Sequence, residues 1–228
     1  MSRPAPVIAI DGPAGAGKST AARRLALRLG YKLVDTGALY RGLALAATEA
    51  GLDLTDAAAV GALARTLDFD FARGEDGRSR LVLGGVDRDD EIRTEKVAAW
   101  ASVVSRHPEV REALLGLQRR FGEKGGVVLE GRDIGTVVFP DAEVKIFLTA
   151  SPEERAKRRV QDLAARGIEA DPAVIATEIR ERDAADANRA IAPLKPAPDA
   201  HLFDTTDHDL DEVVEELVAI VESATKRG

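Results

Sequence analysis

Short apolar runs alternate with helical patterns along most of the chain. Each run is rich in β-branched residues or leucine, and most are followed by a segment with apolar residues at helical spacing. Strands that alternate with helices in this way are typical of a parallel sheet covered by helices, so the pattern predicts the α/β class. The five expected strands are Val7–Asp11, Lys32–Asp35, Val127–Glu130, Val144–Thr149 and Leu202–Asp204.

The helical patterns predict seven helices. Gly30 lies directly after the first of them, where glycine commonly ends a helix. The expected helices run over about Lys18–Leu29, Leu39–Ala50, Ile92–Ser105, Glu109–Phe121, Pro152–Arg166, Pro172–Arg189 and Leu210–Ala224.

The stretch between the second and third strands departs from this rhythm. Asp68–Phe71 alternates polar and apolar residues, Arg80–Leu83 is also strand-like, and Arg73–Gly77 between them is rich in turn residues. We therefore expect an antiparallel hairpin at about residues 68–86. The predicted division of the chain is a nucleotide-binding core at 1–36 and 126–228, with a lid at about 152–190, and an inserted lobe at 37–125.

Composition narrows the class of protein. The chain has 228 residues, of which 45% are hydrophobic and 31% charged, as expected for one large globular domain or one core with insertions. It has no cysteine, which excludes disulfides, thiolate zinc sites and cysteine nucleophiles. No apolar run approaches the length of a membrane span, and the N-terminus has no signal-peptide layout, so we expect a cytoplasmic protein.

The charge balance points to small partners. The net charge of −7 argues against a broad basic surface for nucleic acid, whereas a local arginine cluster is compatible with a small anion. No heptad run or long apolar surface helix requires a second copy, so a monomer is the default expectation.

Gly12–Ser19 gives the strongest chemical signal. It fits G-x-x-x-x-G-K-[ST] between a predicted strand and a predicted helix, which is typical of a loop that surrounds phosphates with backbone N–H groups. Lys18 is expected to reach the β- and γ-phosphates, Ser19 to offer its hydroxyl to Mg²⁺, and Asp11 to hold the water shell of that ion. The alternative is a glycine-rich turn with an exposed lysine. The expected ATP-binding residues are Gly12, Pro13, Ala14, Gly15, Ala16, Gly17, Lys18, Ser19 and Thr20.

A second anion site is expected at the carboxyl edge of the sheet, where open α/β sheets bind ligands. Thr36 follows the second strand and is expected to cap a helix that carries Arg41, and Arg132 and Asp133 follow the third strand. The alternatives are a capped helix with a surface arginine and a structural Arg–Asp pair.

Two helical stripes add further arginines. Arg155, Arg158 and Arg159 share one helix face. Arg182, Asp186 and Arg189 share a face of a later helix. The alternative is a solvated face neutralised by nearby glutamates, but an arginine stripe favours phosphate binding because guanidinium groups bind phosphoryl oxygens in a bidentate manner.

These motifs together resemble the bacterial cytidylate kinases, which are nucleoside monophosphate kinases. The resemblance implies a five-stranded parallel core, a monophosphate-binding lobe enlarged by a small antiparallel sheet, and a short arginine-bearing lid. It covers nearly the whole chain and rests on residues 10–20, 35–41, 91–94, 131–142 and 182–194.

The resemblance also implies roles for individual residues. It implies that Ser102, Arg111 and Asp133 read the cytosine edge, and that Thr36 and Tyr40 belong to the acceptor site. The acceptor phosphate would be held by Arg41, Arg132 and Arg189, with Arg182 and Asp186 near the ribose. Transfer would depend on Lys18, Arg132, Arg158 and Arg159.

The expected reaction is transfer of the ATP γ-phosphoryl group to CMP or dCMP, a step of pyrimidine metabolism. Phosphoryl transfer of this kind needs positioning and charge neutralisation more than a strong base. Two alternatives remain at this stage, a kinase for another nucleoside monophosphate such as UMP and a nucleotide-gated binding module.

Overall fold

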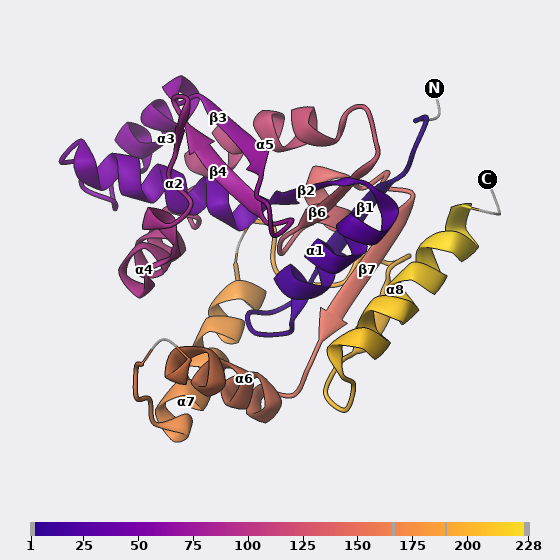
Figure 1. Cartoon of the computed structure of the whole chain (residues 1–228). Coiled ribbons are helices and arrows are strands. Elements are labelled where there is room, and N and C mark those ends of the chain that lie inside the picture. The colour runs from indigo at the N-terminus through magenta and orange to yellow at the C-terminus, as the bar shows by residue number, and fades with distance from the viewer. Residues whose placement is uncertain (1–2, 166, 190, 226–228) are drawn as a thin grey trace.

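Five parallel strands form the central sheet of the computed structural model, which describes residues 3–165, 167–189 and 191–225. The strand order is β2-β6-β1-β7-β8, so the chain crosses over between neighbouring strands through helices (Figure 1). The predicted parallel sheet is confirmed, and four of its strands have the expected bounds. The strands are β1 (Val7–Asp11), β2 (Lys32–Asp35), β6 (Val127–Glu130), β7 (Val144–Thr149) and β8 (His201–Asp204).

Both faces of the inner strands β1, β6 and β7 are buried, which explains their continuous apolar runs. Val7 and Ala9 of β1 belong to one core cluster, and Ile8 and Ile10 belong to the other, as expected for side chains that alternate along a strand. Helices α1 and α8 cover the second face (Figure 1). The bounds of the α-helices are α1 Lys18–Leu29, α2 Thr36–Glu49, α3 Ala57–Thr66, α4 Glu95–Val104, α5 Pro108–Gly122, α6 Pro152–Ala164, α7 Pro172–Ala187 and α8 Leu210–Thr225.

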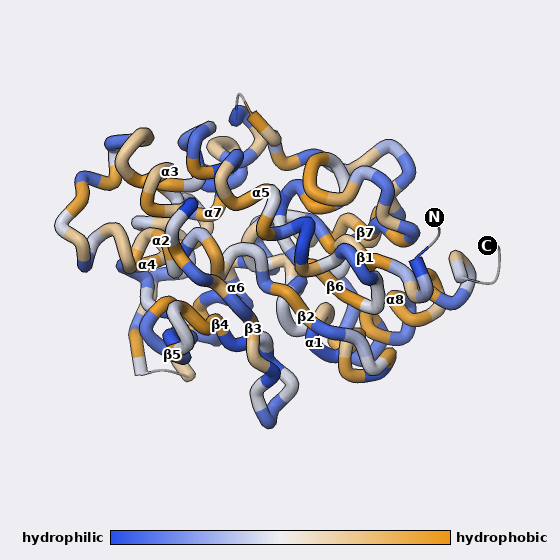
Figure 2. Tube along the Cα trace, turned by 90° about the horizontal axis from the view of Figure 1, so that it is seen from above, coloured by the Kyte–Doolittle hydropathy of each residue, from blue (hydrophilic) through white to orange (hydrophobic). Residues whose placement is uncertain are grey.

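The expected hairpin is present as part of a three-stranded antiparallel sheet. It consists of β3 (Phe69–Arg73), β4 (Ser79–Leu83) and β5 (Val86–Asp87), and the turn between β3 and β4 is strongly hydrophilic (Figure 2). Strand β5 and helix α3 were not predicted from the sequence. A signal for α3 was available, because the Asp56 carboxylate accepts a hydrogen bond from the N–H of Ala59 and caps the helix.

Two predicted helix starts differ from the structure by three residues. The helix expected from Ile92 is divided: Glu91–Arg93 form a 3₁₀ turn, and Thr94 then caps α4 by accepting a hydrogen bond from Val97 N–H. Helix α2 begins at Thr36, but Asp35 and not Thr36 caps it, through Ala38 N–H. The capping residues Asp35 and Thr94 therefore set the starts of α2 and α4, which the spacing of apolar residues alone did not define.

Helices α6 and α7 pack on each other away from the sheet, around a separate cluster that contains Leu163 and Ile179 (Figure 1). Both helices are shorter at their C-terminal ends than predicted. Among the residues described, the structure contains no helix with the length and apolarity needed to span a membrane.

Candidate active site

The loop from Gly12 to Gly17 joins the carboxyl end of β1 to the N-terminus of α1. Gly12 has a φ of 146°, and a Cβ there would lie 1.9 Å from the carbonyl oxygen of Leu148, so no side chain fits. Gly15 and Gly17 also have positive φ values, of 79° and 81°. No side chain caps α1, which leaves its first N–H groups free to bind an anion.

Lys18 and Ser19 begin α1 and lie at the base of this loop. The Lys18 ammonium donates a hydrogen bond to the carbonyl oxygen of Pro13 at 2.6 Å. Burial and the nearby positive charge of Arg132 hold the pKa of Lys18 well below its ordinary value. Ser19 Oγ donates to the carboxylate of Glu130 at 2.7 Å.

Two buried carboxylates lie at the ends of adjacent strands. Asp11 accepts hydrogen bonds from the N–H groups of Ile134 and Gly135, each at 2.8 Å. Burial raises the pKa of Asp11 to about 6. Burial and then the charge of Asp35 raise the pKa of Glu130 to about 7. Both carboxylates are costly to ionise without a cationic ligand.

Asp35 and Arg41 form an ion pair at the end of β2, with a distance of 2.6 Å between nitrogen and oxygen. Burial alone would raise the pKa of Asp35, but the charges of Arg41 and Arg93 hold it below the ordinary value. Arg41 Nε is buried and has no hydrogen-bond partner in the described structure. Thr36 Oγ1 donates to the carbonyl oxygen of Glu130 at 2.7 Å, which ties the start of α2 to the end of β6.

Asp186 holds two of the expected phosphate-binding arginines. Its carboxylate, on α7, accepts from Arg132 Nε at 3.1 Å and from Arg189. Arg182, one turn earlier on α7, is exposed and lies within electrostatic range of Arg132, Arg41 and Arg189. Since one carboxylate faces several guanidinium groups, the cluster retains positive charge for an anion.

Asp133 and Arg111 form a second pair beside this cluster, with both side chains largely buried. The Arg111 guanidinium also lies over the ring of Tyr40, 5.7 Å from the ring centre. Burial raises the pKa of Tyr40, which keeps its hydroxyl protonated. The three side chains present donors and an acceptor on one wall of the site.

Known proteins resemble this chain along nearly its whole length. The family profile for cytidylate kinase matches residues 8–223. The chain is 54% identical to the cytidylate kinase of Pseudomonas aeruginosa over 220 residues, which is 96% of each chain. It is 51% identical to that of Pelotomaculum thermopropionicum, over 97% of this chain and 98% of the other.

This chain belongs to the cytidylate kinase family. A solved gluconokinase structure from Sinorhizobium meliloti shares its fold, with a TM-score of 0.51 at 15% identity over 100% of this chain and 97% of the other. At that identity the likeness concerns the arrangement of strands and helices only. The cytidylate kinase assignment rests on the sequence matches.

The three arginines expected in the lid have three different environments. Arg155 is buried and bridges α6 to α7 and to the loop, since it donates to Asp183 and to the carbonyl oxygen of Ala14. Arg158 donates to Thr205 and lies beside the loop, with Nη1 3.7 Å from where a Cβ of Gly17 would be. The structure thus makes Arg155 a structural clamp and leaves Arg158 at the loop.

Arg159 points from α6 to the other side of the site. Its guanidinium pairs with Glu95 at the start of α4. Ser102 lies on the same helix as Glu95 and is half-buried, and its hydroxyl has no hydrogen bond in the part of the chain described. Among the residues described, neither Arg159 nor Ser102 has a hydrogen bond to the Arg132–Asp186 cluster.

Two residues at the site were not among those predicted from the sequence. Glu130 is the last residue of β6, and its position at a strand end was the available signal. Arg93 pairs with the buried Asp89 at 2.7 Å and acts electrostatically on Asp35 and Glu130. Arg93 also donates to the carbonyl oxygen of Ser79 on β4 at 3.4 Å, so the small antiparallel sheet helps to position this cation.

Proposed function

We propose that this protein transfers the γ-phosphoryl group of ATP to CMP or dCMP, giving ADP and CDP or dCDP. The observation that carries the proposal is that two anion-binding sites lie close together. The positive charges of Arg132 and Arg182 are near enough to Lys18 of the phosphate loop to lower its pKa. A donor phosphate on the loop and an acceptor phosphate on the arginine cluster therefore lie next to each other. Membership of the cytidylate kinase family names the acceptor class.

Each anion site has its own role in transfer. The loop N–H groups and Lys18 bind the donor phosphates, and Arg41, Arg132 and Arg189 orient the acceptor phosphate for attack on the γ-phosphorus. The acceptor oxygen forms the new P–O bond as the bond to the β-phosphate oxygen of ADP breaks. The surrounding guanidinium groups stabilise the charge on the phosphoryl group during transfer.

The residues around Ser19 suit a magnesium ion. The Ser19 hydroxyl lies against the Glu130 carboxylate, and Asp11 is a second buried carboxylate nearby. All of these possible ligand atoms are oxygens, which Mg²⁺ prefers. Mg²⁺ bound there would neutralise phosphate charge. Ser19, Glu130 and Asp11 are the residues proposed to hold it, directly or through water.

The base of the acceptor is proposed to lie against the wall of Asp133, Arg111 and Tyr40. A carboxylate accepts from the exocyclic amine of cytosine, and a guanidinium donates to its ring nitrogen and carbonyl oxygen. Uracil has a carbonyl in place of the amine and would face the Asp133 carboxylate unfavourably. Ser102 is proposed to belong to the same wall, with Thr36, Arg182 and Asp186 nearer the sugar.

The lid is proposed to complete the site. Arg158 lies beside the loop, and Arg159 already contacts Glu95 across the site, so α6 can present cations to the moving phosphoryl group. A closed lid also excludes water, which suppresses hydrolysis of ATP. The division into a core and a lobe at 37–125 belongs to the same proposal.

The test is ADP release from Mg-ATP with CMP, dCMP, UMP, AMP, GMP or no acceptor. We expect rapid release with CMP and dCMP only. Lys18→Ala should lower that rate at least about a hundredfold, whereas Lys124→Ala, which changes an exposed lysine before β6, should not. Release that is independent of any acceptor would overturn the proposal, and a preference for another nucleotide would overturn the assignment of the base.

The monomeric state, the cytoplasmic location and the absence of a nucleic-acid partner remain predictions from the sequence. The first rests on the absence of a heptad run, the second on the absence of a membrane-length apolar run, and the third on the net charge of −7. Sedimentation of the purified protein would test the first of them.

A further inference from the structure

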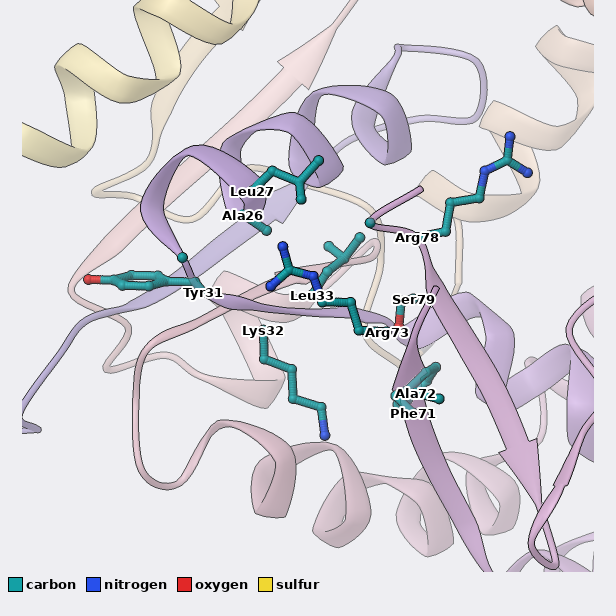
Figure 3. Close-up of a pocket in the computed structure, with 12 residues that line it drawn as sticks. Ala26, Leu27, Tyr31, Lys32, Leu33, Phe71, Ala72, Arg73, Arg78 and Ser79 are labelled. Carbon is teal, nitrogen blue, oxygen red and sulfur yellow. The ribbon is translucent and has the colours of Figure 1, made fainter. Parts of the chain in front are cut away.

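A pocket of about 260 Å³ lies between the phosphate-loop helix and the small antiparallel sheet. The C-terminal turn of α1 and the start of β2 form one side, and β3, β4 and their turn form the other (Figure 3). Leu27, Leu33 and Phe71 provide apolar surface within it. The pocket is separate from the loop and from the arginine cluster, and the proposed reaction does not use it.

Contacts at the hairpin turn hold the two sides of the pocket together. Arg23 on α1 donates to the carbonyl oxygen of Asp76 at 3.1 Å. Gly77 packs so closely that a Cβ would lie 2.7 Å from the Leu27 side chain. The pocket is therefore a built feature of the fold, since the turn is docked on the helix.

Arg73 brings an unpaired charge into this pocket. Its side chain extends from β3 toward the last turn of α1 (Figure 3), and it has no hydrogen bond or ion pair in the described structure. The other cations of the pocket have partners, because Lys32 lies 3.7 Å from Asp70 and Arg78 lies 2.7 Å from Asp76.

Arg73 is not needed to cap the helix that it approaches. The N–H groups of Gly30 and Tyr31 already bond to the carbonyl oxygens of Leu27 and Ala26 at the end of α1. The guanidinium therefore remains available to a ligand.

Ser79 supplies a second unsatisfied group. It lies directly opposite Arg73 in the β3–β4 register and lines the same pocket. The residue is 5% exposed, and its hydroxyl has no hydrogen-bond partner in the described structure. A buried hydroxyl without a partner costs free energy, which a ligand oxygen would relieve.

The geometry points to a second binding site, for a small organic anion with a flat apolar body and one carboxylate or phosphate group. The oxyanion accepts from Arg73 and Ser79, and the body packs on Leu27, Leu33 and Phe71. The size is sufficient, since a dry apolar cavity of about 150 Å³ already binds benzene.

Such a ligand would join two parts of the enzyme. It would contact α1, which begins at Lys18, and the sheet that precedes Arg93.

The test uses the ¹⁵N-labelled full chain with ADP and CMP present in excess, so that the active site is occupied. Phenyl phosphate and benzoate are the anionic probes, and benzyl alcohol is the neutral control. We expect at least one of the two anions to shift the amide signals of Gly77 and Ser79 in a saturable manner. The anion that binds more tightly shows whether the site prefers a phosphate or a carboxylate. Gly15 and Gly131 report the active site.

Variants make the assignment specific. Arg73→Ala and Ser79→Ala should each weaken the anion by about tenfold, whereas Arg65→Ala, at an exposed arginine on α3, should not. Thermal melting confirms that each variant is folded. The proposal is overturned if shifts occur only at Gly15 and Gly131, if Arg73→Ala binds like Arg65→Ala, or if benzyl alcohol binds as tightly as the anions. Because no turnover is measured, failure here is distinct from failure of the kinase activity.

Discussion

Glu130→Gln should make the free protein more stable at alkaline pH while impairing catalysis. Glu130 is 5% exposed, and burial raises its pKa from 4.5 to about 7. Glutamine has the same size and keeps an oxygen that can accept the hydrogen bond from Ser19. The backbone carbonyl that accepts from Thr36 is unchanged, so the substitution removes the charge and little else.

The magnitude follows from proton linkage. Between about pH 4.5 and 7 the folded protein keeps a proton on Glu130 that the unfolded chain has lost, so this residue makes stability fall as pH rises. Each unit of difference between the folded and unfolded pKa is worth about 1.4 kcal/mol, which gives a total of about 3 kcal/mol above pH 7. Asp11 changes stability in the same direction but is present in both proteins, so their difference isolates Glu130.

The assay is urea unfolding of the wild type and the variant at about pH 5 and about pH 8, without metal or nucleotide. The variant should exceed the wild type by less than about 1 kcal/mol at the lower pH and by about 3 kcal/mol at the higher pH. Glu215→Gln is the control, because Glu215 is 63% exposed and pairs with Arg28 on the surface. Parallel stability curves for wild type and Glu130→Gln would refute the reasoning.

Three further substitutions test other parts of the site. Asp133→Asn should raise the KM for CMP at least about tenfold with little change in ATP affinity, and an equal loss of both would make its role structural. Arg93→Lys should raise the KM for CMP by a similar factor because lysine cannot form the two-pronged contact with Asp89, while Arg88→Ala on the same segment should leave it unchanged. Gly12→Ala should lower the melting temperature and abolish ATP binding, since its Cβ would overlap a backbone oxygen; a normal melting curve with intact binding would contradict the loop geometry.

The elements that could be predicted from sequence are those fixed by local patterns. The inner strands β1, β6 and β7 of the central sheet are buried on both faces, so their apolar runs begin and end with the strands themselves, as at Val127–Glu130. The loop before Lys18 could be predicted because several glycines are required at defined positions. The two-residue strand β5 is too short to carry a period, and its pairing with β4 depends on a turn.

The features that could not be predicted depend on contacts between distant segments. The pair of Arg159 and Glu95 joins residues far apart in the chain, and neither one signals the other locally. Arg155 could not be distinguished from Arg158 by helical spacing, because their difference comes from Asp183 on another helix. Glu130 ends an apolar strand, and its role emerges only when β6 pairs beside β1 and β2.

The site contains buried cations and buried carboxylates, and keeping either kind of group charged costs free energy in the free protein. Burial and Arg132 lower the pKa of Lys18, and burial and Asp35 raise that of Glu130. Phosphates provide the missing partner for the cations, and a metal ion provides it for the carboxylates. Ligands that relieve such costs stabilise the fold strongly, because they bind only the folded state. Glu130→Gln removes the buried negative charge that a bound metal ion would otherwise neutralise. The variant should therefore show a smaller rise in melting temperature with Mg-ATP than the wild type. An unchanged rise would show that Glu130 does not help to bind the metal ion.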